Sequence, residues 1–212
     1  MKIRLHLKIF IFIIIFIITG QIKSYGLLML FALIHELGHM VVGIILGFKP
    51  YNLEIMPVGI SISFKAKAEN YNKKIGKGTL LTLKKIVIAT AGPLTNIIIV
   101  ILVSKFNFLE KDLITYSNIL LAIFNLIPIY PLDGGRILKE ILTIRIGRKK
   151  AYIFTNKISN GVVILLTAIS SIAILYYKNI AIVIILMYLW YLIIIENKKL
   201  RKKEQIYNKL KM

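Results

Sequence analysis

Six long apolar runs constrain this 212-residue chain more than any other feature of its sequence. A helix needs about 17–25 predominantly apolar residues to cross the hydrocarbon core of a bilayer, and each run is that long. Hydrophobic residues make up 58% of the chain, whereas about 45–50% is usual for a soluble domain. We therefore predict an all-α polytopic membrane protein with six transmembrane helices. The predicted spans are residues 3–20, 26–48, 86–104, 113–132, 158–177 and 179–195.

Little of the chain lies outside these spans. The longest connections are a loop of about 35 residues after the second span and one of about 25 residues after the fourth, and neither is long enough for a separate folded domain. We expect one membrane domain over residues 1–195 and a basic cytoplasmic tail over residues 196–212.

Basic residues set the predicted orientation. The chain has 29 Lys and Arg against 9 Asp and Glu, for a net charge of +20. If the N-terminus is cytoplasmic, 25 of the 29 basic residues lie on the cytoplasmic side, and only Lys23, Lys105, Lys111 and Lys178 lie outside. This bias indicates a multi-pass protein of the cell membrane with both termini in the cytoplasm. A cleaved signal peptide is the alternative for the first run, but no small-x-small cleavage site follows Gly20.

The same charges indicate a membrane partner and not a nucleic acid. They lie between apolar runs, where they contact anionic lipid headgroups. We therefore expect the lipid bilayer as a partner and no nucleic acid. The chain also has no cysteine, which excludes disulfides, thiolate metal ligands and cysteine nucleophiles. A metal site must therefore use His, Asp or Glu.

The second span contains the sequence His35-Glu36-Leu37-Gly38-His39. Residues four apart share one face of a helix, so both imidazoles can bind one zinc ion at about 2.0–2.1 Å. In this pattern Glu36 lies beside the metal, where it acts as a catalytic base and not as a ligand. Gly38 leaves room for a neighbouring helix or a substrate backbone. The alternative, a satisfied polar cluster, would cost several kcal/mol in hydrocarbon without metal or water.

A catalytic zinc needs a third protein ligand, and Asp133 at the end of the fourth span is the leading candidate. Pro128 and Pro131 break the helix just before it, and the two glycines that follow it permit a sharp turn. A broken helix can turn a side chain into a polar cavity. The alternative is a loop carboxylate that pairs with Arg136. The carboxylates predicted in loops, in the tail or at span ends are Glu54, Glu69, Glu110, Asp112, Glu140, Glu196 and Glu204.

These motifs resemble the intramembrane site-2 zinc metalloprotease family. That family combines H-E-x-x-H in one transmembrane helix with an aspartate in an N-x-x-P-x-x-P-L-D-G-G type motif two helices later, and residues 125–135 here fit that motif. Residues 91–96, Ala-Gly-Pro-Leu-Thr-Asn, are also similar to family usage. The resemblance implies a zinc metalloendopeptidase with one Zn²⁺ ion. It assigns His35, His39 and Asp133 as metal ligands, Glu36 as the catalytic base and Asn125 as a contact to the substrate backbone.

Within the family, the six-span layout and the Pro-Leu-Asp-Gly-Gly-Arg string most resemble the stage IV sporulation proteases, which process a pro-sigma factor at the cytoplasmic side of the membrane. The resemblance implies a peptide or protein substrate, in the narrowest case a pro-sigma factor, and membrane inhibitor proteins as further partners. We expect no CBS domain in the short tail and no PDZ domain in the loop after the second span. The open alternative is a general site-2-type protease that acts on other membrane substrates.

Residues 60–65, Ile-Ser-Ile-Ser-Phe-Lys, alternate between apolar and polar with the period of a strand. With the Pro-Val-Gly before them, they predict a short membrane-associated β-hairpin over residues 53–64, close to the zinc. An exposed edge there could pair with an extended substrate, which makes Ile60 and Ile62 candidate substrate-binding residues. The alternative is a surface hairpin that only covers the helices.

Asn96 and Asn125 are candidate contacts to the substrate or to its oxyanion, although a buried asparagine often only joins membrane helices. Two other functions stay open. A prenyl-protein endopeptidase would need further Glu and His ligands on other helices. A transporter would use His35, His39 and Asp133 to conduct ions. The substitution Glu36→Gln separates these functions, because a protease would keep its zinc and lose turnover.

Overall fold

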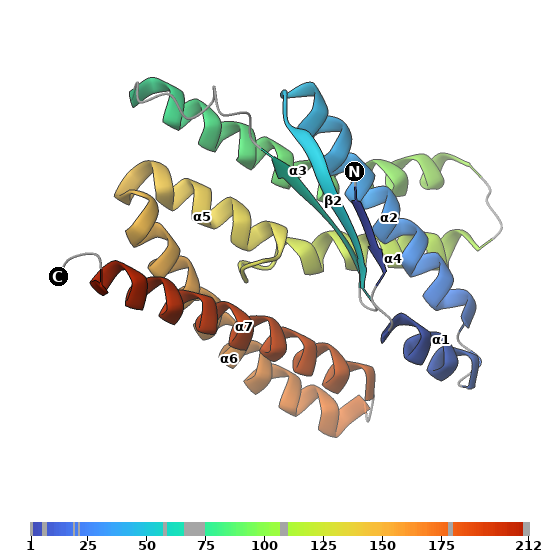
Figure 1. Ribbon diagram of the computed structural model, residues 1–212. Coiled ribbons are helices and arrows are strands. Elements are labelled where there is room, and N and C mark those ends of the chain that lie inside the picture. Colours follow the sequence, from blue (N-terminus) through green and yellow to red (C-terminus); the bar gives the residue numbers. More distant parts are fainter. Residues whose placement is uncertain are drawn as a thin grey trace. The chain divides into compact units, whose positions relative to one another are not determined.

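The computed structural model describes residues 2–5, 8–18, 20, 22–56, 59–65, 75–106, 110–177 and 180–209. Within this part of the chain, seven helices and three strands form two compact units, Met1–Asn125 and Leu126–Met212 (Figure 1). The prediction of a mostly helical chain with a β-hairpin after the second long apolar helix is confirmed.

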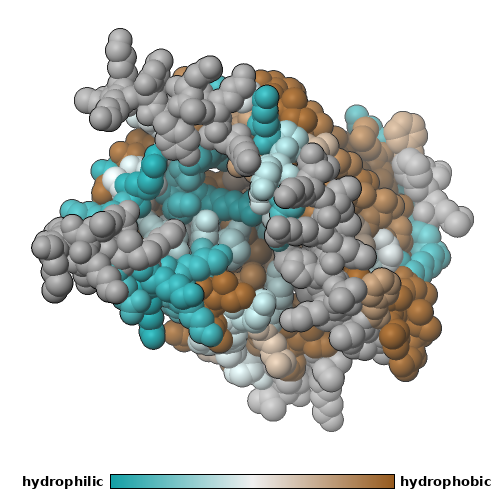
Figure 2. All heavy atoms as spheres, in the orientation of Figure 1, coloured by the Kyte–Doolittle hydropathy of each residue, from teal (hydrophilic) through white to brown (hydrophobic). Residues whose placement is uncertain are grey.

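Three described helices are long and apolar enough to cross a membrane: Ile22–Ile45, Gly78–Lys105 and Arg148–Ile172. Their isoleucine, leucine and valine side chains are largely exposed, and Figure 2 shows hydrophobic side chains in brown on the outward surface. Exposed apolar surface of this extent is expected where lipid, and not water, surrounds the protein. The chain is a membrane protein with several transmembrane helices.

The first unit is built on α2 (Ile22–Ile45) and α3 (Ile75–Lys105), which pack against each other. The predicted role of Gly38 in close helix packing is confirmed. A Cβ atom added there would collide with the Thr95 hydroxyl of α3. At the end of α2, Lys84 of α3 donates a hydrogen bond to the carbonyl of Leu46 over 3.0 Å, which satisfies one of the carbonyls that a helix end leaves open.

The opposite end of this unit is fixed by two basic residues. Lys23, in the first turn of α2, forms an ion pair with Glu110 at 2.5 Å. Lys111, which begins α4 (Lys111–Leu126), donates to the carbonyl of Ser104 near the end of α3 over 3.1 Å. The start of α2, the end of α3 and the start of α4 therefore lie at the same end of the unit, where the charge pattern places three of the four outer lysines.

The predicted hairpin over residues 53–64 is present as β2 (Lys49–Met56) and β3 (Gly59–Lys65), and a third strand extends the sheet. β1 (Lys2–Leu5) pairs in parallel with β2, so the strand order is β1-β2-β3. Among the described strands, none lies beside the other edge of β3. Figure 1 shows the sheet beside α2. Its base packs on a core of Phe48, Leu81 and Ile88, to which Val42, Leu46 and Phe64 add partly buried side chains.

The prediction of a helical span over residues 3–20 is wrong at its start. Residues 2–5 are strand, and α1 covers only Lys8–Ile18. At 1.5 Å per residue its 11 residues extend about 16 Å, about half of a 30 Å hydrocarbon core. The sequence Lys-Ile-Arg-Leu has the alternation of a strand, but its apolar members merge with the long run that follows.

The second unit contains α5 (Asp133–Ile146), α6 (Arg148–Tyr177) and α7 (Ile180–Lys209). α6 packs against both of the other helices. Amide side chains join α6 to α7, since Asn156 donates to Asn197 over 2.5 Å. Asn160 accepts a hydrogen bond from the same Asn197 over 3.2 Å. The described part of the predicted tail continues α7 to Lys209.

The prediction that places Glu140 in a loop is wrong, and Glu196, predicted at the start of the tail, is buried. Glu140 lies in α5 and is 8% exposed, and Glu196 lies in α7 and is 4% exposed. Each has a lysine within ion-pair distance, Lys139 at 3.8 Å and Lys199 at 3.0 Å. Burial of these groups depends on packing between helices, which the local sequence does not report.

Candidate metal centre

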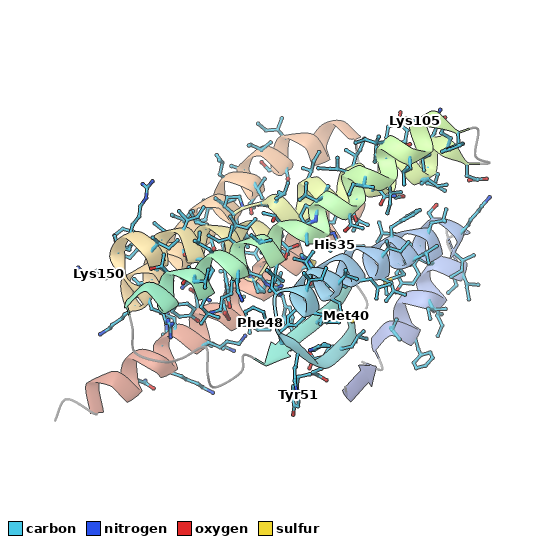
Figure 3. All side chains as sticks on the ribbon, turned by 90° about the horizontal axis from the view of Figure 1, so that it is seen from above. His35, Met40, Phe48, Tyr51, Lys105 and Lys150 are labelled. Atoms are coloured by element: carbon cyan, nitrogen blue, oxygen red, sulfur yellow. The ribbon has the colours of Figure 1, made fainter. Side chains whose placement is uncertain are left out.

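The imidazoles of His35 and His39 lie side by side on the buried face of α2. Their exposed fractions are 3% and 2%, and their Nε2 atoms are 3.2 Å apart. Figure 3 shows the labelled His35 between α2 and α3. The four-residue spacing thus brings two ligand atoms to one point, as the sequence predicts for a metal-binding pair.

The backbone of α3 orients His39. Its Nδ1 atom is 2.6 Å from the carbonyl oxygen of Ile88 and 3.2 Å from the backbone nitrogen of Gly92. Only one of these contacts is a hydrogen bond in a given tautomer, because a protonated Nδ1 donates and an unprotonated one accepts. The shorter contact favours Nδ1–H donating to Ile88. Nε2 then carries a lone pair, which is the state that binds a metal.

Glu36 is buried on the same helix and faces the hairpin. The backbone N–H of Ile62 in β3 donates to Glu36 Oε2 over 3.2 Å. The hairpin therefore reaches the depth of the histidine pair, as predicted. Ile62 pairs in register with Leu53 of β2, but its N–H goes to α2. Successive N–H groups of a strand alternate in direction, so Ile60 and Phe64 also point theirs to the edge that faces Glu36.

Asp133 belongs to the second unit, where it is the first residue of α5 and is 4% exposed. The glycines at 134 and 135 fix its position, because an added Cβ would come within 2.6 Å of the carbonyls of Ile127 and Ile129, respectively. The helix break ahead of Asp133 is confirmed, since α4 ends at Leu126. Arg136 lies with Nη1 3.5 Å from Asp133 Oδ1, so the pairing considered as an alternative is present.

His35 and His39 of the first unit and Asp133 of the second unit are buried side chains of metal-ligand type. Two imidazoles and one carboxylate are a ligand set that catalytic zinc uses, whereas Mg²⁺ and Ca²⁺ prefer oxygen ligands alone. The donor chemistry therefore fits zinc.

The predicted substrate-binding residues lie in α3, in α4 and in β3. Asn96 of α3 is fully buried, and within the described part of the chain neither its amide nitrogen nor its oxygen has a hydrogen-bond partner. Asn125 is half-buried and donates to the carbonyl of Leu121 over 3.0 Å. Ile60 pairs with Ile55 in the hairpin, and the side chain of Ile62 is 4% exposed. Their contacts with a substrate stay predictions.

Comparison with known proteins finds similarity to one family of peptidases. The model of peptidase family M50 matches residues 107–170. Stage IV sporulation protein FB of Bacillus subtilis is 26% identical over 158 residues, which are 72% of this chain and 51% of that protein. A zinc metalloprotease of Methanocaldococcus jannaschii is 29% identical over 177 residues, which are 76% of this chain and 47% of that protein. In sequence the chain is thus similar to peptidase family M50 and to these two proteins.

A solved structure supports the same fold. The site-2 protease from Methanocaldococcus jannaschii superimposes with a TM-score of 0.68 at 24% identity, and the match covers 92% of this chain and 89% of that one. The seven described helices and the sheet therefore form a site-2 protease fold. The chain spans about half the length of the curated relatives it matches.

The sequence analysis assigns no role to two residues of this site-2 protease fold that contact His39, although one of them, Gly92, lies in the 91–96 stretch that is similar to family usage. The carbonyl of Ile88 leaves no signal, because every residue has one. Gly92 left a weak signal, since a glycine inside a helix needs a packing or functional reason. Both lie on α3, and their contact with α2 depends on how the two helices pack.

Proposed function

We propose that the chain is an intramembrane zinc endopeptidase that cleaves a membrane-associated or transmembrane protein near the cytoplasmic face. The observation that carries this proposal is the position of Glu36. Glu36 directly follows His35 in the sequence, and His35 lies beside His39. The Glu36 carboxylate accepts a hydrogen bond from Ile62 at the edge of β3 that faces away from β2. A base, a metal-ligand pair and a surface that can hold an extended peptide are thus parts of one unit.

His35 and His39 would hold zinc together with Asp133 of α5. When bound, zinc supplies Lewis acidity that polarises the carbonyl of the scissile bond. Glu36 takes a proton from the attacking water and later passes it to the leaving amine. Burial of Glu36 strengthens its interaction with the reacting groups, because the local dielectric constant is low.

The substrate would bind as an added strand along β3. A helical substrate hides its carbonyls in its own hydrogen bonds, so a protease must first unwind it. The N–H of Ile62 already donates to Glu36, and the N–H groups of Ile60 and Phe64 on the same edge of β3 can donate to carbonyls of an extended peptide. Asn96 and Asn125 would add polar contacts to the substrate backbone. The unpartnered amide of Asn96 supports such a role, since a buried amide without a hydrogen bond is costly.

We propose the six-span topology with both termini in the cytoplasm. β1 runs parallel to β2, which begins just after the C-terminal end of α2. At about 3.3 Å per strand residue and 1.5 Å per helix residue, β1 and α1 together extend about 30 Å. A strand and a short helix would therefore share the first crossing.

A pro-sigma factor processed during sporulation is the narrowest substrate that we propose. The similarity to a stage IV sporulation protein supports this substrate, and general membrane substrates are the alternative. The test is cleavage by the purified chain in detergent, with a pro-sigma factor and an unrelated single-span protein as substrates. We expect cleavage that a chelator abolishes and added zinc restores. Zinc-loaded protein that cleaves neither substrate would contradict the proposed activity.

A further inference from the structure

Gly92 lies inside α3 at the point where that helix meets the two imidazoles. A Cβ added to Gly92 would lie 2.5 Å from Nε2 of His35 and closer still to Nε2 of His39. Real Cβ contacts of this length essentially do not occur, so one of the groups would have to move. The space that a side chain would fill at position 92 is thus taken by the two atoms that would bind the metal.

A second glycine of the same helix provides the contrast. A Cβ added to Gly78 would meet no atom of the described residues within 4 Å. Glycine inside a helix destabilises it relative to alanine. A glycine there is therefore either tolerated at a cost or required by its surroundings. Only Gly92 has an evident reason in its surroundings. Close helix packing alone does not supply that reason, because the nearest atoms are imidazole atoms and not backbone of α2.

The same turn of α3 also orients His39. In a regular helix the N–H of Gly92 donates to the carbonyl of Ile88, four residues earlier. His39 Nδ1 approaches both of these groups, at 3.2 Å and 2.6 Å. Pro93 follows directly and has no N–H, so it cannot make its own bond in this turn. The backbone of this turn, from Ile88 to Pro93, therefore contacts the His39 ring through a carbonyl and an N–H group.

We propose that Gly92 is a positioning residue of the metal centre. Its missing side chain leaves the space in which both Nε2 atoms converge, and the Ile88 carbonyl beside it holds His39 in the metal-binding tautomer. This inference rests on the zinc site of the proposed function. A side chain as small as a methyl group at position 92 separates the two ligand atoms, and the helix itself keeps its hydrogen bonds.

The first test measures zinc affinity of the full chain in detergent by competition with a chromophoric chelator. We expect Gly92→Ala to weaken zinc binding about 10- to 100-fold, the range seen when groups that orient a ligand are changed. Gly78→Ala should bind zinc like the parent. A Gly92→Ala protein with parental zinc affinity would overturn the role of Gly92 alone. A parent protein that binds no zinc would contradict the proposed metal site, and the inference would fail with it.

If Gly92→Ala folds poorly, a double-mutant cycle shows whether the collision with the two imidazole rings is the cause. Thermal unfolding is compared for Gly92→Ala in the parent and in a background with both His35→Ala and His39→Ala. The melting temperature should fall in the parent, where the methyl group collides with the rings. It should stay level or rise in the background without rings, since alanine favours the helix. An equal fall in both backgrounds would overturn the proposal.

Discussion

His39 binds a metal only if the proton of its ring is on the nitrogen that faces away from the ligand site. The contact of 2.6 Å between Nδ1 and the Ile88 carbonyl favours that state. Both imidazole ligands therefore come from a single helix, α2, of the first unit. Asp133 is different, because it already interacts with Arg136. A shared carboxylate still has further lone pairs for a cation.

At the scale of single residues, substitution of any ligand should remove the metal. We expect His35→Ala, His39→Ala and Asp133→Ala to lose zinc and proteolysis together, because two ligands do not hold a catalytic zinc firmly. Metal analysis of the purified proteins, together with a cleavage assay, is the measurement. Glu140→Gln is the matched control, since it changes another buried carboxylate of α5 and should keep its zinc. Full zinc content in Asp133→Ala would remove Asp133 from the ligand set.

At the scale of elements, proline separates the two edges of β3. Ile60→Pro deletes an N–H on the free edge, and we expect cleavage to slow about 2- to 10-fold, as for one lost hydrogen bond. Zinc content and melting temperature should stay close to those of the parent. Ser61→Pro instead deletes an N–H that faces β2, so it should lower the melting temperature. Unchanged cleavage by Ile60→Pro would contradict strand addition.

A disulfide can locate the substrate on this strand. A cysteine at Ser63, which is exposed on β3, should crosslink to a cysteine near the cleavage site when Glu36→Gln traps the complex. Crosslinks that form only to α6 and α7 would place the substrate elsewhere, and the metal chemistry would be unaffected.

The elements that could be predicted from sequence are those with a local pattern. The His35–His39 pair depends on helical spacing alone, and the hairpin depends on alternation between residues 60 and 65. β1 could not be predicted, because its alternation ends where an apolar run begins and its partner lies about 50 residues away. The burial of Glu140 and the carbonyl contact of Ile88 depend on helix packing. Local sequence carries no signal for either.

At the scale of the whole molecule, the charge distribution predicts which face the substrate enters. Cysteines placed near Lys74 and Lys149 should react with a membrane-impermeant reagent only after the cytoplasmic face is opened. A cysteine near Lys111 should react from outside the cell. Lys111 lies at the same end of the first unit as the ion pair between Lys23 and Glu110. Labelling of the Lys74 or Lys149 positions in intact cells would contradict the proposed topology. It would also contradict entry of the substrate from the cytoplasm.

The substitution Glu36→Gln tests the central claim most directly, with zinc content and peptide-bond cleavage measured on the same purified samples. Glutamine keeps the shape of the side chain but cannot accept the proton. We therefore expect one zinc per chain, as in the parent, and cleavage slower by about 10²- to 10⁴-fold. Asp112→Asn, an exposed carboxylate of α4, should leave both unchanged. Cleavage by Glu36→Gln at the parental rate, or loss of zinc from it, would contradict the assignment of Glu36 as the base of a zinc endopeptidase.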